Sequence, residues 1–166
     1  MTEKAPSGPS RTKRSLAVLL YTAAAGAYVL DRVTKVLAEQ HLAGRPPIRL
    51  IPDILHLRFT ENPGGAFGLF GGLTWLFVAA SVIVVVVVVM ASRNLPSRST
   101  AVALGLVLGG AIGNITDRVI RGSGFSGEVV DFLDLRVWPV FNVADSAIVV
   151  GAAILLIAGL RPEKKE

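Results

Sequence analysis

The sequence predicts a mainly α-helical membrane protein: a bundle of four transmembrane helices with a small extracytoplasmic β-sheet and a short interfacial helix. Three observations support this fold class. Hydrophobic residues make up 52% and charged residues 17% of the 166 residues, and the mean hydropathy of +0.59 is too high for a soluble domain. Four apolar segments each approach the roughly 20 residues that cross a bilayer. Two of the connections between them contain short strand-like runs.

The four apolar segments cover residues 15–30, 73–91, 99–120 and 139–160. The first continues as an amphipathic helix to about Ala38, and the second contains no charge and a run of valines over residues 84–89. Valine favours strands in water, but a single strand in lipid leaves its backbone polar groups unpaired, whereas a helix pairs them internally. All four segments are therefore expected to be helices.

The polar ends bound one domain. Residues 1–14 are rich in Pro, Ser, Lys and Arg and are expected to form a disordered cytoplasmic tail. Residues 161–166 form a second cytoplasmic tail, which leaves residues 15–160 as a single integral-membrane domain. Basic residues gather in both tails and in the loop of residues 92–98, so the positive-inside rule places both termini in the cytoplasm. A cleaved signal peptide over residues 1–30 is disfavoured because helical patterning continues past the cleavage point.

The two outer connections have strand and loop character. Residues 55–60 alternate apolar and polar side chains, and residues 129–132 form another strand-like run after a Gly-rich turn. Together they predict a small sheet resting on the outer membrane face. Residues 62–72 are rich in glycine and include Phe67 and Phe70, which suits a short segment lying in the membrane interface.

The composition excludes several classes of function. The chain has no cysteine, which excludes disulfides, thiolate metal sites and a cysteine nucleophile. His41 and His56 have no His or Cys neighbour in sequence, so a zinc site would need carboxylate ligands and is not expected. The pI of about 10.1 does not indicate nucleic-acid binding, because the basic residues flank the apolar segments. Phosphate-loop, dinucleotide and Ser/His/Asp motifs are not found.

The motif Asn-x-x-Asp occurs twice inside apolar segments, at residues 114–117 and 142–145. A carboxylate among apolar membrane residues is costly and therefore indicates a functional site. The third and fourth helices are antiparallel, so Asp117 and Asp145 are expected to face each other and to share one proton. One would then activate water as a general base while the other serves as a general acid.

The same residues have structural interpretations as well. Asp117 can pair with Arg118 or Arg121 at the helix end, and Asp145 can bond to a neighbouring helix. Asn114 and Asn142 can each donate to the carboxylate one turn later, or can join two helices.

Charged residues near the pair leave further alternatives open. Asp31 and Lys35, spaced i, i+4, can form an ion pair within the first helix or can support the site. Arg118 can hold substrate or can pair with Asp131 or Asp134. A proton-coupled carrier is the alternative function, but it would require acids across the full membrane depth, and the second apolar segment has none.

Five blocks of sequence, in order, resemble those of the lipoprotein signal peptidase family, the type II signal peptidases of bacteria, which are membrane aspartic proteases. The blocks are residues 31–35 (Asp-Arg-Val-Thr-Lys), 62–67 (Asn-Pro-Gly-Gly-Ala-Phe), 109–118 (ending Gly-Asn-Ile-Thr-Asp-Arg), 129–132 (Val-Val-Asp-Phe) and 141–145 (Phe-Asn-Val-Ala-Asp).

This resemblance implies an enzyme of the bacterial cytoplasmic membrane, with a β-cradle and an interfacial helix outside and the active site near the outer leaflet. It implies Asp117 and Asp145 as the catalytic pair. The supporting residues would be Asp31, Lys35, Asn62, Asn114, Arg118 and Asn142. Substrates would be prolipoproteins with a diacylglyceryl group on the lipobox cysteine, cut on the N-terminal side of that cysteine. Membrane lipids and globomycin-type inhibitors are further implied partners, and the protein is expected to be a monomer without metal or cofactor.

Overall fold

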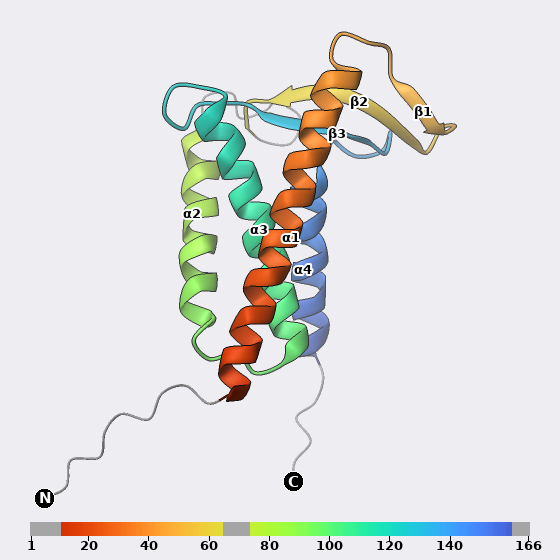
Figure 1. Cartoon of the computed structure of the whole chain (residues 1–166). Coiled ribbons are helices and arrows are strands. Elements are labelled where there is room, and N and C mark those ends of the chain that lie inside the picture. Colours follow the sequence, from red (N-terminus) through yellow and green to blue (C-terminus); the bar gives the residue numbers. More distant parts are fainter. Residues whose placement is uncertain (1–10, 65–73, 161–166) are drawn as a thin grey trace, which may run out of the picture.

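A small sheet lies across one end of a helical bundle. The computed structural model describes residues 11–64 and 74–160. The helices are α1 (Arg11–Leu42), α2 (Thr74–Ala91), α3 (Arg98–Ile120) and α4 (Val143–Gly159). The strands are β1 (Ile48–Ile51), β2 (Leu55–Asn62) and β3 (Val129–Asp134). Figure 1 shows the sheet at the end of the bundle where α1 ends and α4 begins, opposite the turn between α2 and α3.

Within the described residues, three helices are long and apolar enough to cross a membrane: α1 from Thr12 onward, α2 and α3. The chain is therefore a multi-pass membrane protein. The apolar α4 has 17 residues and is shorter than those three. It begins at Val143 rather than at the predicted residue 139, because Asn142 is its N-cap residue and ends the preceding extended segment.

Other predicted boundaries differ from the structure or lie outside the described residues. Helix α1 begins at Arg11, inside the tail that was expected to be disordered up to residue 14. Residues 1–10 and 161–166 lie outside the described residues, as does most of the predicted interfacial helix, residues 65–72.

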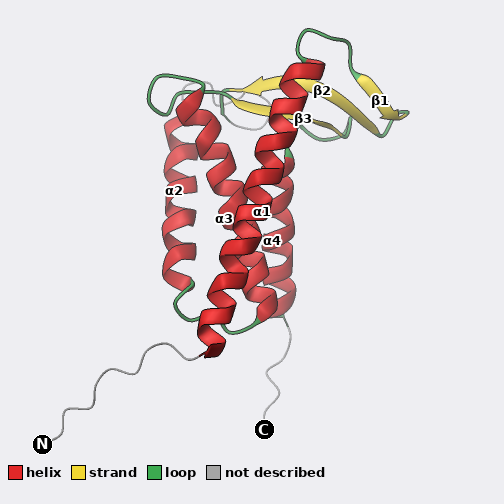
Figure 2. Ribbon diagram, in the orientation of Figure 1, coloured by secondary structure: helices red, strands yellow, loops and turns green. Residues whose placement is uncertain are grey.

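The sheet is antiparallel throughout, with β2 between β1 and β3 (Figure 2). Strand β3 is buried along almost its whole length. Its Val130 and Phe132 pack with Ala38 and Leu42 from the last turns of α1. This contact fixes the sheet to the helices, and it places the side chains of β3 against the end of α3 and the start of α4.

Glycines on α3 allow α1 and α4 to approach it closely. A Cβ atom at Gly109 would collide with the carbonyl oxygen of Ala24 on α1, and one at Gly110 would collide with that of Ala144 on α4. Small residues at such positions let helix backbones meet in a membrane, where packing replaces the hydrophobic driving force. As a result, α3 lies between α1 and α4 and brings its polar residues level with theirs.

Candidate active site

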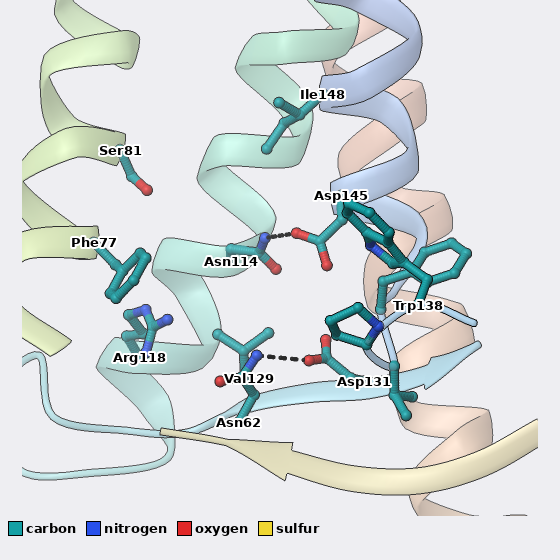
Figure 3. Close-up of a pocket in the computed structure, with 13 residues that line it drawn as sticks. Asn62, Phe77, Ser81, Asn114, Arg118, Val129, Asp131, Trp138, Asp145 and Ile148 are labelled. Carbon is teal, nitrogen blue, oxygen red and sulfur yellow. Dashed lines mark hydrogen bonds between the residues drawn. The ribbon is translucent and has the colours of Figure 1, made fainter. Parts of the chain in front are cut away.

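A cavity of about 330 Å³ opens where the sheet meets the helices. Its walls come from α2, α3, α4, strands β2 and β3 and the connection before α4. Its polar lining consists of Asn62, Ser81, Asn114, Arg118, Asp131 and Asp145. Figure 3 shows Asp145 from α4 and Asp131 from β3 on the same side of this cavity, each reached by an asparagine.

Asp131 and Asp145 are each held by two hydrogen bonds. Asp131 accepts from Asn62 Nδ2 at 2.9 Å and from Asn142 Nδ2 at 2.7 Å. Asp145 accepts from Asn114 Nδ2 at 2.8 Å and from the backbone N–H of Asn142 at 3.2 Å. Asp131 is only 2% exposed, and its burial together with the nearby Asp145 carboxylate raises its pKa to about 7. Two acids therefore line one cavity, and Asp131 is partly protonated near neutral pH.

Asn142 connects the two acids because it begins α4. Its side-chain oxygen accepts from the backbone N–H of Asp145 at 2.9 Å, and the Asp145 carboxylate accepts from the backbone N–H of Asn142. This reciprocal arrangement is a capping box. With its oxygen used by the cap, the side-chain nitrogen of Asn142 is free to donate to Asp131. The helix start thus fixes the distance between strand β3 and Asp145.

Asp117 lies in a separate ionic cluster next to the cavity. Lys35 Nζ is 2.9 Å from Asp117 Oδ2, 2.9 Å from Asp31 Oδ2 and 2.9 Å from Asn114 Oδ1. Arg32 forms a further ion pair with Asp117. The side chains of Asp31, Lys35 and Asp117 are fully buried. Asp117 is thus paired with two cations of α1, whereas Asp31 Oδ2 has an ion pair with Lys35 but no hydrogen-bond partner. The cavity lining does not include Asp117.

The structure does not place Asp117 and Asp145 face to face, as the repeated motif predicted. Lys35 and Asn114 lie between them, because Lys35 bonds to Asp117 and Asn114 while Asn114 donates to Asp145. The bond expected from Asn114 to Asp117 along the helix is replaced by this bond across to α4.

Two structural interpretations made from the sequence are present in the structure. The ion pair between Asp31 and Lys35 forms, and Asp117 lies 3.5 Å from Arg121 Nε at the end of α3. The absence of a side chain at Gly113 leaves room for the Asp31 carboxylate, because a Cβ atom at this position would lie 2.5 Å from Asp31 Oδ2.

Arg118 lines the cavity opposite the two acids. Its Nη1 donates to the carbonyl oxygen of Gly127 at 3.3 Å, and its guanidinium carbon lies 6.0 Å from the centre of the Phe77 ring. Among the described residues it forms no ion pair with Asp131 or Asp134, the structural alternative expected from the sequence. Its charge therefore faces the cavity from the side of α2 and α3.

The chain matches the family Signal peptidase (SPase) II over residues 23–161. It belongs to the signal peptidase II family. A lipoprotein signal peptidase of Rhodococcus jostii is 45% identical over 163 residues, covering 96% of this chain and 81% of the relative. One of Desulfitobacterium hafniense is 44% identical over 142 residues, covering 84% of this chain and 91% of the relative. A bacterial membrane enzyme solved at 2.3 Å has a TM-score of 0.71 at 28% identity, covering 93% of this chain and 94% of that one.

In this signal peptidase II chain, sequence reasoning missed part of the cavity lining. Asp131 was expected as part of a strand, as part of the block at residues 129–132 and as an alternative partner of Arg118, but not as a site residue, although an acid between apolar residues of a buried strand is itself a signal. Ser81, the single polar residue in the middle of α2, also lines the cavity. Among residues 11–64 and 74–160, no group of three or more acidic or histidine side chains has the arrangement of a metal site.

Proposed function

We propose that this chain is a membrane aspartic endopeptidase that removes signal peptides from prolipoproteins, with Asp131 and Asp145 as its catalytic pair. The prolipoprotein substrate follows from the signal peptidase II family. The observation that supports the pair is that both carboxylates line one cavity and share Asn142 as a hydrogen-bond partner. Cleavage takes place on the N-terminal side of a cysteine that carries a diacylglyceryl group.

The two acids have different environments and therefore different roles. Asp131, with a pKa of about 7, is protonated in a substantial fraction of molecules at neutral pH, and this form donates its proton to the reacting peptide group as a general acid. Asp145 accepts a proton from a water molecule, whose oxygen attacks the carbonyl carbon. Collapse of the tetrahedral intermediate breaks the C–N bond, and the proton held by Asp145 passes to the leaving amine. One hydroxyl of the intermediate becomes the carbonyl of the product acid and returns its proton to Asp131.

Asp117 serves in this scheme as a positioning residue. Its Oδ2 accepts from the backbone N–H of Val130 at 3.3 Å, and Val130 directly precedes Asp131. The positive charge of Lys35 balances Asp117 at 2.9 Å, so Asp117 is engaged with the protein and does not contact the cavity. It anchors the strand that carries the general acid.

The membrane placement of the site is part of the proposal. All four helices cross the membrane, with both termini in the cytoplasm of a bacterial cell. The start of α1 and the turn between α2 and α3 lie at the end of the bundle away from the sheet (Figure 1), and these short segments are dense in basic residues, with Lys13, Arg14, Arg93 and Arg98 among them. The cavity then lies near the outer leaflet, where a lipidated substrate arrives by diffusion in the membrane plane. Globomycin-type inhibitors would occupy the same cavity, and a monomer is sufficient for this chemistry.

Substitution of the acids in purified enzyme tests the assignment. With a diacylglyceryl lipobox peptide, Asp131→Asn and Asp145→Asn should each lose about 10²-fold or more in kcat. Asp117→Asn is the matched control, a buried acid outside the cavity, and should retain measurable turnover below its own unfolding temperature. An unlipidated peptide measures the contribution of the lipid. If folded Asp117→Asn is inactive while Asp131→Asn is active, the catalytic pair is Asp117 and Asp145.

A further inference from the structure

An apolar groove of about 400 Å³ lies against α4, on the side where Trp138 and Phe141 approach the helix. Trp138, Phe141 and Asp145 line both this groove and the active-site cavity. The two hollows therefore meet at Asp145. Leu135 completes the groove near the sheet, and Val149 and Val150 line its other end.

The groove has a polar group at one end and apolar walls elsewhere. Ser146 also lines it, but the Ser146 hydroxyl already donates to the carbonyl oxygen of Asn142 at 2.9 Å. Val149 and Val150 follow Asp145 by about one helical turn and are about 6–8 Å farther from the sheet along the axis. A ligand that fits this shape has a polar reacting group at Asp145 and a hydrocarbon chain running along α4.

We propose that this groove holds one acyl chain of the diacylglyceryl group on the substrate cysteine. The inference rests on the proposed function, since it requires the peptide bond before that cysteine to lie at Asp145. The lipid is attached to the side chain of the residue directly after the cut, so its chains must leave the site within a few bonds of Asp145. The groove begins at that point and follows the helix, which is the direction of lipid chains in a bilayer.

The groove acts through orientation more than through affinity. An acyl chain in the bilayer already lies in hydrocarbon, so moving it onto Val149 and Val150 gives little hydrophobic gain. A chain held in a groove, however, fixes the rotation and depth of the cysteine to which it is attached, and misplacement by about 1 Å can cost about 10²-fold in rate. The groove should therefore favour cleavage of substrates whose chains are long enough to fill it.

Filling the groove tests the proposal. Val149→Phe and Val150→Phe are compared with Val87→Phe on α2, a matched control because Val149, Val150 and Val87 are 67%, 50% and 56% exposed. The substrates are two lipobox peptides, one with palmitoyl and one with butyryl chains on the glyceryl cysteine. The groove variants should lower the ratio of kcat/KM for palmitoyl over butyryl substrate about tenfold, while Val87→Phe leaves the ratio at the wild-type value.

The outcomes separate this inference from the proposed function. If wild-type enzyme cleaves neither peptide, the proposed function fails. If wild-type enzyme cleaves both but the groove variants keep the wild-type ratio, or lose both activities equally, the acyl groove is refuted.

The occupant is identified by photolabelling. A diazirine near the end of the palmitoyl chain of the peptide, bound to Asp145→Asn enzyme, should label Val149 and Val150 above all other positions on the helices. A phosphatidylglycerol with the same diazirine should label α2 and α4 equally. Preferential labelling by the free lipid, or crosslinks between two copies of the chain through α4, would overturn the proposal.

Discussion

Lys35 Nζ lies 2.9 Å from Asp117 Oδ2, and both side chains are completely buried. A charge pair of this kind is costly to desolvate and is stable only when each partner is satisfied. Here Lys35 also bonds to Asp31 and Asn114, so the ammonium links α1 to the residue that donates to Asp145. The buried ion pairs therefore help to fix the position of Asp145 in the cavity.

Removal of the ammonium should destabilise the protein strongly. Lys35→Met leaves Asp31 and Asp117 with reduced compensation, and loss of one partner from a buried ion pair costs about 3–5 kcal/mol. Thermal unfolding in detergent, followed by the fluorescence of Trp75 and Trp138, measures this effect. The double variant Lys35→Met/Asp31→Asn should recover part of the loss, because Asp117 keeps Arg32 and Arg121 as partners. A double variant whose loss equals the sum of the two single losses would contradict a coupled cluster.

Two substitutions of Asn142 should distinguish its contribution to protein stability from its contribution to catalysis. Asn142→Ala removes the N-cap and should cost about 1 kcal/mol of stability. Asn142→Ser keeps a capping oxygen for the start of α4 but has no nitrogen to donate to Asp131. We therefore expect Asn142→Ser to unfold close to the wild-type temperature while its kcat falls about tenfold or more. Wild-type kcat in Asn142→Ser would show that the bond of 2.7 Å to Asp131 has no catalytic role.

The helices could be predicted from the sequence, whereas the site could be predicted only in part, as the repeated Asn-x-x-Asp motif shows. Membrane helices follow from local hydropathy, and α2 and α3 begin within a residue of the predicted positions. The roles of the two Asn-x-x-Asp motifs depend on what lies beside them. At residues 142–145 the motif starts a helix, so its spacing forms a capping box. At residues 114–117 it lies inside a helix, and its two side chains bond to different neighbours, one toward α4 and one toward α1.

Asp131 was missed for a related reason. Its neighbours in sequence, Val130 and Phe132, are typical of a buried strand. The local sequence does not indicate which side chains from other elements lie next to the Asp131 carboxylate. Its two partners, Asn62 and Asn142, come from β2 and from the start of α4. The pairing of Asn62 with Val129 in the sheet brings the first of these into reach, and such a register is not encoded locally.

The pH dependence of cleavage should report the proton on Asp131. Burial and the Asp145 charge raise the pKa of Asp131 from 3.8 to about 7, so the proton is present below about pH 7 and is lost above it. As general acid, Asp131 must be protonated, and kcat/KM should fall about tenfold per pH unit well above pH 7. The apparent value belongs to the coupled pair of acids. A profile that rises through pH 7 would assign the general-base role to Asp131.

Arg118 should influence the pH dependence of kcat/KM through its positive charge. The guanidinium faces the cavity and interacts electrostatically with Asp131, and a positive charge near a carboxyl group lowers its pKa. Arg118→Ala removes the charge, so the alkaline fall in kcat/KM should move to higher pH, accompanied by weaker turnover. Arg118→Lys keeps the charge, although it replaces the planar guanidinium that lies over the Phe77 ring, and its alkaline fall in kcat/KM should stay near the wild-type position. If Arg118→Ala reduces turnover while the profile keeps its shape, Arg118 contributes only through its bond to Gly127 and its packing against Phe77.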